Sequence, residues 1–245
     1  PDKPPLTFLA VRASFGLFGG VSPFAARVPL FLSSVGALAF CYLLIRQLQG
    51  PRLALVATPM IALAVRFVWT GKWLRLDMPM LAFVFAAFWI STRLLFPRPG
   101  QKPVGAGMAL LGWLFITMAG LAKGPGVLVW IGVIVTYAAV SRRWEPLRIH
   151  RPLAGLAILV GAFLAWLIPA YHFGGTEYLG PMIGTHVVER FAGTVQHAKN
   201  PFYFLYRTPV DLLPAGLLLP VALWHGWKTR KSVRDEGQTR FIYCW

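Results

Sequence analysis

The sequence predicts an all-α protein: a polytopic bundle of transmembrane helices with interfacial helices on its outer face. Three observations lead to this fold class. Hydrophobic residues make up 57% of the 245-residue chain, and the mean hydropathy is +0.61. Only 13% of the residues are charged, which is about half the share expected of a soluble domain. The apolar residues come in long runs and do not alternate, which favours helices in lipid over a β-barrel.

Seven apolar runs are expected to cross the bilayer, which takes about 20 helical residues. They lie at about 26–48, 53–70, 77–96, 104–121, 125–141, 152–173 and 206–227, and an eighth run begins near 241. Two other stretches, about 5–20 and 177–195, mix apolar and charged residues, which suits helices lying along the membrane surface. The whole chain, 1–245, is expected to form one transmembrane domain.

The ends of the chain suggest that it is truncated on both sides. It begins with Pro1 and not with Met, and it has no signal-like segment. It stops a few residues into the run that begins near 241. We therefore expect a fragment, with a C-terminal domain beyond its end. The two cysteines, Cys41 and Cys244, form no CxxC pair and predict neither a structural disulfide nor a thiolate metal site.

The net charge is +16, from 24 Lys and Arg residues against 8 Asp and Glu residues. In a soluble protein this would indicate nucleic-acid binding. Here most basic residues sit in short loops between apolar runs, so nucleic acid is not expected as a partner. Fourteen lie in the loops after the odd-numbered runs: Arg46, Arg52, Arg93, Arg98, Lys102, Arg142, Arg143, Arg148, Arg151, Lys228, Arg230, Lys231, Arg234 and Arg240.

The excess of positive charge places these loops in the cytoplasm. The opposite face carries fewer basic residues, mixed with acids and histidines, and has the longest connection, at about 174–205. Charged groups of both signs at a membrane boundary are costly unless they serve a function. We therefore expect the chemistry on the extracytoplasmic side of a bacterial inner membrane.

Four short motifs on this outer face could carry chemistry. In Asp2-Lys3-Pro4-Pro5, Lys3 is either a headgroup anchor or a phosphate ligand. In the segment 72–79, Asp77 is either a helix N-cap or the partner of Arg75 in a charge pair lining a cavity. Lys123, between glycines and a proline, either snorkels to the interface or approaches a ligand.

The fourth motif is His186-Val-Val-Glu189-Arg190, followed by His197. His186 and Arg190 are four residues apart and share one helix face, which is either a solvated face or a site for phosphate or a metal ion. The histidine spacing is too loose to assign a metal. Together the motifs place Lys3, Lys123 and Arg190 on one face beside the lipid headgroups. Such a cluster suits a phosphate ester whose lipid tail lies between helices.

At these residues the chain resembles the polytopic glycosyltransferases of the GT-C type. It is most similar to the aminoarabinose-transferase-like and protein-mannosyltransferase-like group, glycosyltransferase families 39 and 83. The resemblance rests on residues 2–6, Ala26-Arg27-Val28-Pro29, Arg75-Leu-Asp77-Met-Pro79, Gly120-Leu-Ala-Lys123-Gly-Pro125, and His186 with Arg190-Phe191, His197 and Pro201-Phe202-Tyr203.

The resemblance implies that a sugar moves from a polyprenyl-phosphate carrier, undecaprenyl phosphate in bacteria, to an extracytoplasmic acceptor such as lipid A, another glycolipid or a protein. By analogy, Lys3 would contact the carrier phosphate, assisted by Arg190 and Lys123, while Asp2 and His186 would hold a divalent ion if one is used. No other cofactor is expected. Family members carry an essential acid in an outer loop that would precede Pro1, so the catalytic base is not assigned to Asp77.

Two other functions fit parts of the pattern. A transporter or flippase for a lipid-linked or anionic substrate would need polar groups and broken helices at mid-membrane depth. A structural subunit without an active site would direct the outer basic residues away from one another.

Overall fold

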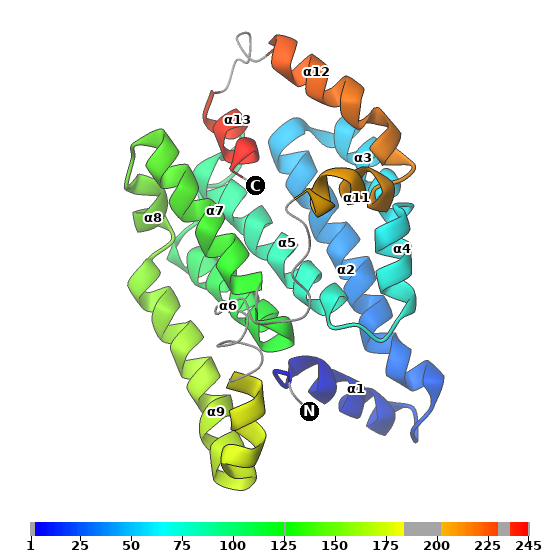
Figure 1. Cartoon of the computed structure of the whole chain (residues 1–245). Coiled ribbons are helices and arrows are strands. Elements are labelled where there is room, and N and C mark those ends of the chain that lie inside the picture. Colours follow the sequence, from blue (N-terminus) through cyan, green and yellow to red (C-terminus); the bar gives the residue numbers. More distant parts are fainter. Residues whose placement is uncertain (1–2, 125, 184–201, 230–235, 245) are drawn as a thin grey trace.

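The computed structural model describes residues 3–124, 126–183, 202–229 and 236–244. Every regular element in these ranges is helical, which confirms the predicted all-α class (Figure 1). The α-helices are α1 (Leu6–Leu17), α2 (Pro23–Gln49), α3 (Pro51–Ala62), α4 (Val65–Lys72), α5 (Asp77–Leu95), α6 (Ala106–Lys123), α7 (Gly126–Ser141), α8 (Glu145–Ile149), α9 (Pro152–Ile183), α11 (Tyr203–Asp211), α12 (Leu219–Thr229) and α13 (Glu236–Tyr243).

Four helices of the described chain are long and apolar enough to cross a membrane: α2, α5, α6 and the Pro152–Glu177 part of α9. The bent pair α3–α4 makes a fifth span if it is counted as one. The predicted number of seven is therefore too high by this measure. Run 125–141 forms the 16-residue helix α7. Run 206–227 is interrupted, because α11 ends at Asp211 and a 3-10 turn, Ala215–Leu218, precedes α12.

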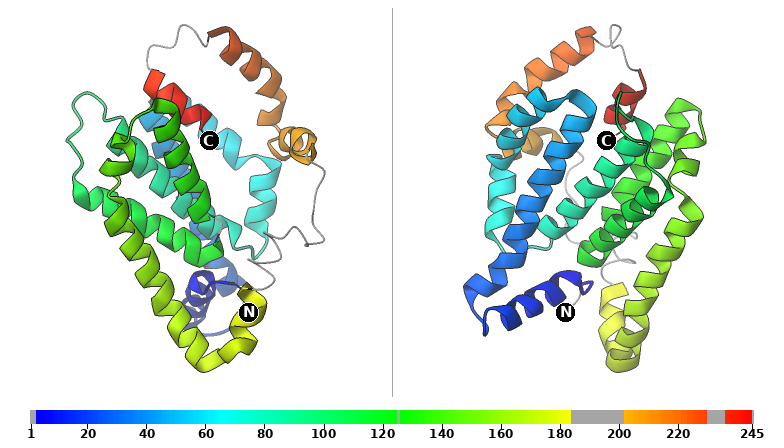
Figure 2. Two further views of the ribbon diagram at one scale, coloured as in Figure 1. Left: turned by 60° about the vertical axis from the view of Figure 1, so that its left-hand side comes forward. Right: turned by 180° about the vertical axis from the view of Figure 1, so that it is seen from behind.

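Helices α2, α5, α6 and α7 pack side by side and enclose an aromatic core (Figures 1 and 2). Phe88, Trp113, Trp130 and Tyr137 are at most 7% exposed. Gly120 lets α6 approach its neighbours closely, since a Cβ atom there would come within 2.6 Å of Val127 Cγ2. Small residues at such crossings are typical of helix packing in lipid.

A buried polar network ties α5, α6 and α7 to the loop after α8. Ser91 on α5 accepts a hydrogen bond from Trp130 Nε1 at 3.0 Å and lies 3.0 Å from His150 Nε2. The backbone carbonyl of His150 accepts a hydrogen bond from Trp113 Nε1 at 2.7 Å. The Nδ1 atom of the His150 ring lies 2.5 Å from the Pro146 carbonyl oxygen. Burial lowers the pKa of His150, so the ring is neutral at physiological pH.

The second predicted span, 53–70, is bent by 57° between α3 and α4. A break inside a bilayer leaves backbone groups that must be satisfied by protein. The N–H of Val65, the first residue of α4, donates to the Leu213 carbonyl at 2.9 Å. The turn after α11 thus satisfies the backbone of the broken span, which explains why these distant segments lie together (Figure 1).

Helix α9 changes direction near its end, where Gly175 has non-helical angles (φ 59°, ψ −162°). The sequence placed the end of this span at 173 and an interfacial helix from 177, so the observed break falls between the two. Residues 184–195 of that interfacial stretch lie outside the described residues. The other interfacial prediction, 5–20, corresponds to α1, which lies across one end of the bundle in the right-hand view of Figure 2.

The described loops gather at two opposite ends of the bundle (Figure 1). At one end, Arg98 Nε donates to the Gln47 carbonyl at 3.1 Å, and Phe241 of α13 is fully buried beside Tyr137. This end holds the loops that the sequence assigns to the cytoplasm. The other end holds α1, the start of α5, the turn between α6 and α7, and the bend of α9.

Candidate functional site

The start of α1 forms one part of the candidate site. Pro4 and Pro5 precede the helix, and Pro5 is its N-cap residue, with no side chain that can accept a hydrogen bond. The first backbone N–H groups of α1 therefore lack intrahelical partners. Lys3 lies immediately before them and is partly buried. An ammonium beside a helix N-terminus is a favourable environment for an anion such as phosphate.

Thr7 is a residue at this helix start that the sequence analysis missed. It is only 4% exposed, and its hydroxyl has no hydrogen-bond partner among the described residues. A buried hydroxyl without a partner is costly, so it is a candidate to meet a ligand. Its position two residues after the Pro-Pro pair was the available signal. Helix α1 packs against both α2 and α6, which fixes the place of this donor group.

The second part is an ion pair between Lys123 and Asp77. Lys123 is the last residue of α6 and Asp77 the first residue of α5, and each side chain is 33% exposed. A carboxylate at a helix start and a cation at a helix end both interact favourably with the helix dipoles. Gly124, with φ at 76°, ends α6 directly after the lysine. The pair therefore fastens the outer ends of two neighbouring helices.

This pairing corrects both predictions made for Asp77. Leu76 and not Asp77 occupies the N-cap of α5, and no side chain caps the helix there. The carboxylate contacts Lys123 from a distant helix and not its sequence neighbour Arg75. Arg75 is exposed in the turn before α5. Lys123 in turn does not simply extend into the headgroups, because a carboxylate holds it.

Four of the predicted site residues lie outside the described residues: Asp2, His186, Arg190 and His197. The start of α1, the start of α5 and the end of α6 lie at the same end of the bundle (Figure 2). Lys123 and Asp77 are in contact there. Within the described chain, no three His, Cys, Asp or Glu side chains are grouped so that they could hold a metal ion. Asp2 and His186, the pair suggested for a divalent ion, lie outside the described chain.

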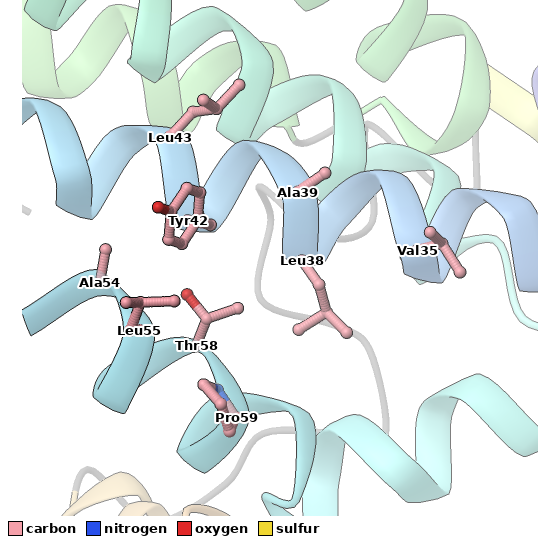
Figure 3. A pocket seen from close by; sticks show the side chains of 9 residues that line it. All are labelled: Val35, Leu38, Ala39, Tyr42, Leu43, Ala54, Leu55, Thr58 and Pro59. Carbon is pink, nitrogen blue, oxygen red and sulfur yellow. The ribbon is translucent and has the colours of Figure 1, made fainter. Parts of the chain in front are cut away.

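An apolar groove opens between α2 and α3, with a volume of about 530 Å³ (Figure 3). Its lining is aliphatic apart from the Tyr42 ring and hydroxyl and the Thr58 hydroxyl. No charged side chain lines it, so it can accommodate hydrocarbon but not a phosphate group. It lies along the middle and later part of α2, away from the end of the bundle that holds Lys3.

The sequence from residue 2 to residue 170 matches the family described as dolichyl-phosphate-mannose-protein mannosyltransferase. The chain belongs to this family. The match confirms the resemblance to membrane glycosyltransferases. A multi-pass membrane protein is expected of such a chain, in agreement with the apolar helices.

The names of curated relatives of the chain are more specific than the description of the family. The undecaprenyl phosphate-alpha-4-amino-4-deoxy-L-arabinose arabinosyl transferase of Edwardsiella ictaluri is 31% identical over the whole chain and 43% of its own length. The enzyme of the same name from Aeromonas hydrophila is 28% identical, over the whole chain and 44% of its length. The chain thus spans less than half the length of the curated relatives it matches.

Solved structures share the fold of the chain. ArnT from Cupriavidus metallidurans bound to undecaprenyl phosphate superposes on 98% of the chain and 43% of its own length, with a TM-score of 0.75 and 20% identity. The same protein in the apo state gives a TM-score of 0.70. The GT-C-like helical architecture expected from the resemblance is confirmed.

Proposed function

We propose that the protein to which this chain belongs is a glycosyltransferase that moves a sugar from undecaprenyl phosphate to an acceptor on the outer side of the bacterial inner membrane. The observation that carries the proposal is Lys3 at the uncapped start of α1, in a chain of the mannosyltransferase family. The names of the curated relatives make 4-amino-4-deoxy-arabinose the first sugar to test and a lipid A-type glycolipid the first acceptor.

The reaction needs an anion site at the membrane surface. An acceptor hydroxyl attacks the anomeric carbon, the bond between that carbon and the phosphate oxygen breaks, and the polyprenyl phosphate leaves with an added negative charge. A carboxylate base takes the proton of the hydroxyl. In this proposal the departing phosphate is stabilised by Lys3, the N–H groups at the start of α1 and the Thr7 hydroxyl, in a low-dielectric setting. Arg190 is proposed as a further cation.

Lys123 has a different part in this proposal. Its ammonium contacts Asp77 in the structure, so a carrier phosphate would share it with that carboxylate or displace the carboxylate. Asp77 is correspondingly engaged as an ion-pair partner, which agrees with leaving the role of base unassigned to it. The divalent ion suggested for Asp2 and His186 remains part of the proposal and is testable by metal removal.

The orientation in the membrane follows from charge. The end of the bundle opposite to Lys3 carries most of the loop arginines, and the positive-inside rule places that end in the cytoplasm. The candidate site then faces the periplasm, where acceptors outside the cytoplasm are found. The long apolar helices provide the surface along which the polyprenyl chain lies.

The bent span α3–α4 is the one feature that the rival transport function also requires. The residues at the bend, Leu63, Ala64 and Val65, are apolar, and the Val65 N–H is satisfied by a backbone carbonyl. Arg66, the next residue, is exposed and is not buried within the bundle. A transport pathway would place polar groups at such a break. The described charges of the candidate site lie instead at helix ends, which favours chemistry at the membrane surface.

The decisive test is Lys3→Ala in the full-length protein, assayed with a panel of undecaprenyl-phosphate sugars. Loss of one preorganised contact to developing charge lowers the turnover rate by roughly 100- to 1,000-fold. Lys72→Ala is the matched control, because Lys72 is an exposed lysine at the same end of the bundle. Unchanged thermal unfolding for both variants, with turnover lost only for Lys3→Ala, supports the proposal. Near-normal turnover of Lys3→Ala rejects the phosphate role.

A further inference from the structure

The loop between α7 and α9 concentrates positive charge at the end of the bundle opposite to the candidate site. Residues 142–151, here called the arginine loop, read Arg-Arg-Trp-Glu-Pro-Leu-Arg-Ile-His-Arg. All four arginines are exposed, and Glu145 is the one acid among them. None of the four guanidinium groups is ion-paired within the described part of the chain. The loop therefore presents uncompensated positive charge.

Contacts with the helical core fix the arginine loop in place. Pro146 and His150 are buried, and His150 is bonded to Ser91 and to Trp113 of the core. Pro146 and His150 thus anchor the loop to the core, while the four arginines remain exposed. A fixed loop holds its charges in one arrangement, so less entropy is lost when a ligand binds.

Two of the arginines occupy backbone positions that favour glycine. The end of α7 is a Schellman motif, in which Arg143 N–H donates to the Ala138 carbonyl and Arg142 N–H to the Ala139 carbonyl, each at 3.1 Å. Arg142 then adopts φ 53°, and Arg151, after α8, adopts φ 52°. A left-handed conformation is strained for an arginine. Arginine at both positions indicates that its side chain has a use there.

The surroundings of the loop identify the ligand as lipid. Arg151 immediately precedes the spanning part of α9, so the loop lies at the membrane boundary. Trp144 is 73% exposed in the middle of the loop, and Leu153 is 84% exposed at the start of the span. Exposed tryptophan beside arginine is typical of the headgroup region. A soluble acidic partner would have no need of apolar side chains at this depth.

We propose that the arginine loop binds the phosphate groups of anionic phospholipids in the leaflet opposite to the candidate active site. Arginine pairs with phosphate through two parallel hydrogen bonds, and four arginines around Trp144 can hold the headgroups of one diphosphate lipid or two monophosphate lipids. The site would fix the depth and tilt of α7 and α9 in the bilayer. It does not depend on the proposed transfer reaction.

The test measures lipid binding by the full-length protein. The protein is purified in detergent, exchanged into nanodiscs of phosphatidylcholine with a minor share of phosphatidylglycerol or cardiolipin, and the retained lipids are counted by native mass spectrometry. We expect enrichment of the anionic lipids over phosphatidylcholine. In Arg142→Asn/Arg151→Asn we expect affinity to fall roughly fivefold for each arginine at low salt. Asparagine tolerates the left-handed backbone, so thermal unfolding in pure phosphatidylcholine should not worsen.

The matched control is Arg52→Gln/Lys102→Gln, which removes two exposed positive charges from the same end of the bundle. Full retention of anionic lipid by the control, with loss in the loop variant, supports a specific site. Equal loss in both variants would show a diffuse charge effect and overturn the proposal. The proposal would also be overturned if the unmodified protein did not enrich anionic lipids over phosphatidylcholine. That result is expected if the partner of the loop is an acidic protein. If the asparagine variant unfolds, Arg143→Gln/Arg148→Gln provides the same test away from the strained positions.

A further arm of the experiment distinguishes a site for lipid headgroups from a site for free phosphate. Inorganic phosphate is added to the nanodiscs at constant ionic strength, adjusted with chloride. A headgroup site supported by Trp144 retains its lipid. Displacement of the lipid by inorganic phosphate, beyond the effect of chloride, would contradict the proposal because it would indicate a simple anion site. Transfer activity should persist in the loop variant, so the failure of this proposal and that of the proposed reaction are distinguishable.

Discussion

Asp77 and Lys123 illustrate what single residues in this chain can and cannot reveal. Both were selected from the sequence as outer-face charges, and both lie at the predicted end of the bundle. The predicted ion-pair partner of Asp77, Arg75, was wrong, because the spacing of residues along the chain indicates only sequence neighbours. Lys123 is 46 residues away and becomes adjacent only when α5 and α6 pack side by side. The free start of α1 was similarly visible as Pro4-Pro5, whereas the burial of Thr7 depends on α1 packing against other helices.

The ion pair leads to a prediction that separates structure from binding. Both Asp77→Asn and Lys123→Met should lower the free energy of unfolding by about 1 kcal/mol, since the pair is partly exposed. Only Lys123→Met should also weaken binding of undecaprenyl phosphate, because Asp77→Asn leaves the ammonium available. Thermal unfolding and carrier binding are measured on the same samples. Equal losses of carrier affinity in the two variants would limit Lys123 to a structural role.

His150 gives a prediction about pH. Its pKa is lowered from 6.5 by burial, so protons bind the unfolded chain more readily than the folded one. The stability associated with the neutral ring is therefore complete above 6.5 and is lost as the pH falls from there through the lower folded pKa. Melting temperatures between about pH 8 and about pH 5 should fall more steeply for the unmodified protein than for His150→Gln. Parallel curves for the two proteins would contradict this assignment.

At the scale of elements, apolar runs predicted helices well and breaks poorly. Run 26–48 corresponds to α2, run 77–96 to α5 and run 104–121 to α6, because uninterrupted apolar sequence is sufficient for a spanning helix. The bend between α3 and α4 was missed, since its free backbone group is satisfied by Leu213, far along the chain. The break in 206–227 has local signals, Pro209, Pro214 and Gly216, which the mean hydropathy of the run does not reflect.

The packing of α9 on α6 can be tested at one glycine. A Cβ atom at Gly155 would overlap the indole of Trp113, which donates to the His150 carbonyl. Gly155→Ala should therefore displace the indole and destabilise the protein by roughly 1–3 kcal/mol. Gly161→Ala, on the same helix, has open space around the new methyl group and should be neutral or stabilising by up to about 1 kcal/mol. Thermal unfolding of the two variants is compared, and equal melting temperatures would contradict the close contact.

At the scale of the whole molecule, the distribution of loop charge has to agree with the end of the bundle at which each loop lies. The described loops that the sequence assigned to the cytoplasm lie at one end of the bundle, and the start of α1, the start of α5 and the end of α6 lie at the other (Figure 1). This division follows from hydropathy and loop charge, which act on the chain independently of its detailed packing. The contacts within each end, such as the Ser91–His150 network, require the folded arrangement of several helices and leave no pattern in the sequence.

The resulting topology can be tested with two cysteines. Leu74 is 59% exposed in the turn before α5, and Lys102 is exposed in the loop between α5 and α6 at the opposite end. In a Cys244→Ser background, Leu74→Cys should react with a membrane-impermeant maleimide when intact spheroplasts are treated from outside. Lys102→Cys should react only after the membrane is permeabilised. Cys41 is 3% exposed inside α2 and should contribute little background. Labelling of Lys102→Cys from outside would reverse the orientation, move Lys3 to the cytoplasmic side and remove the basis for transfer to a periplasmic acceptor.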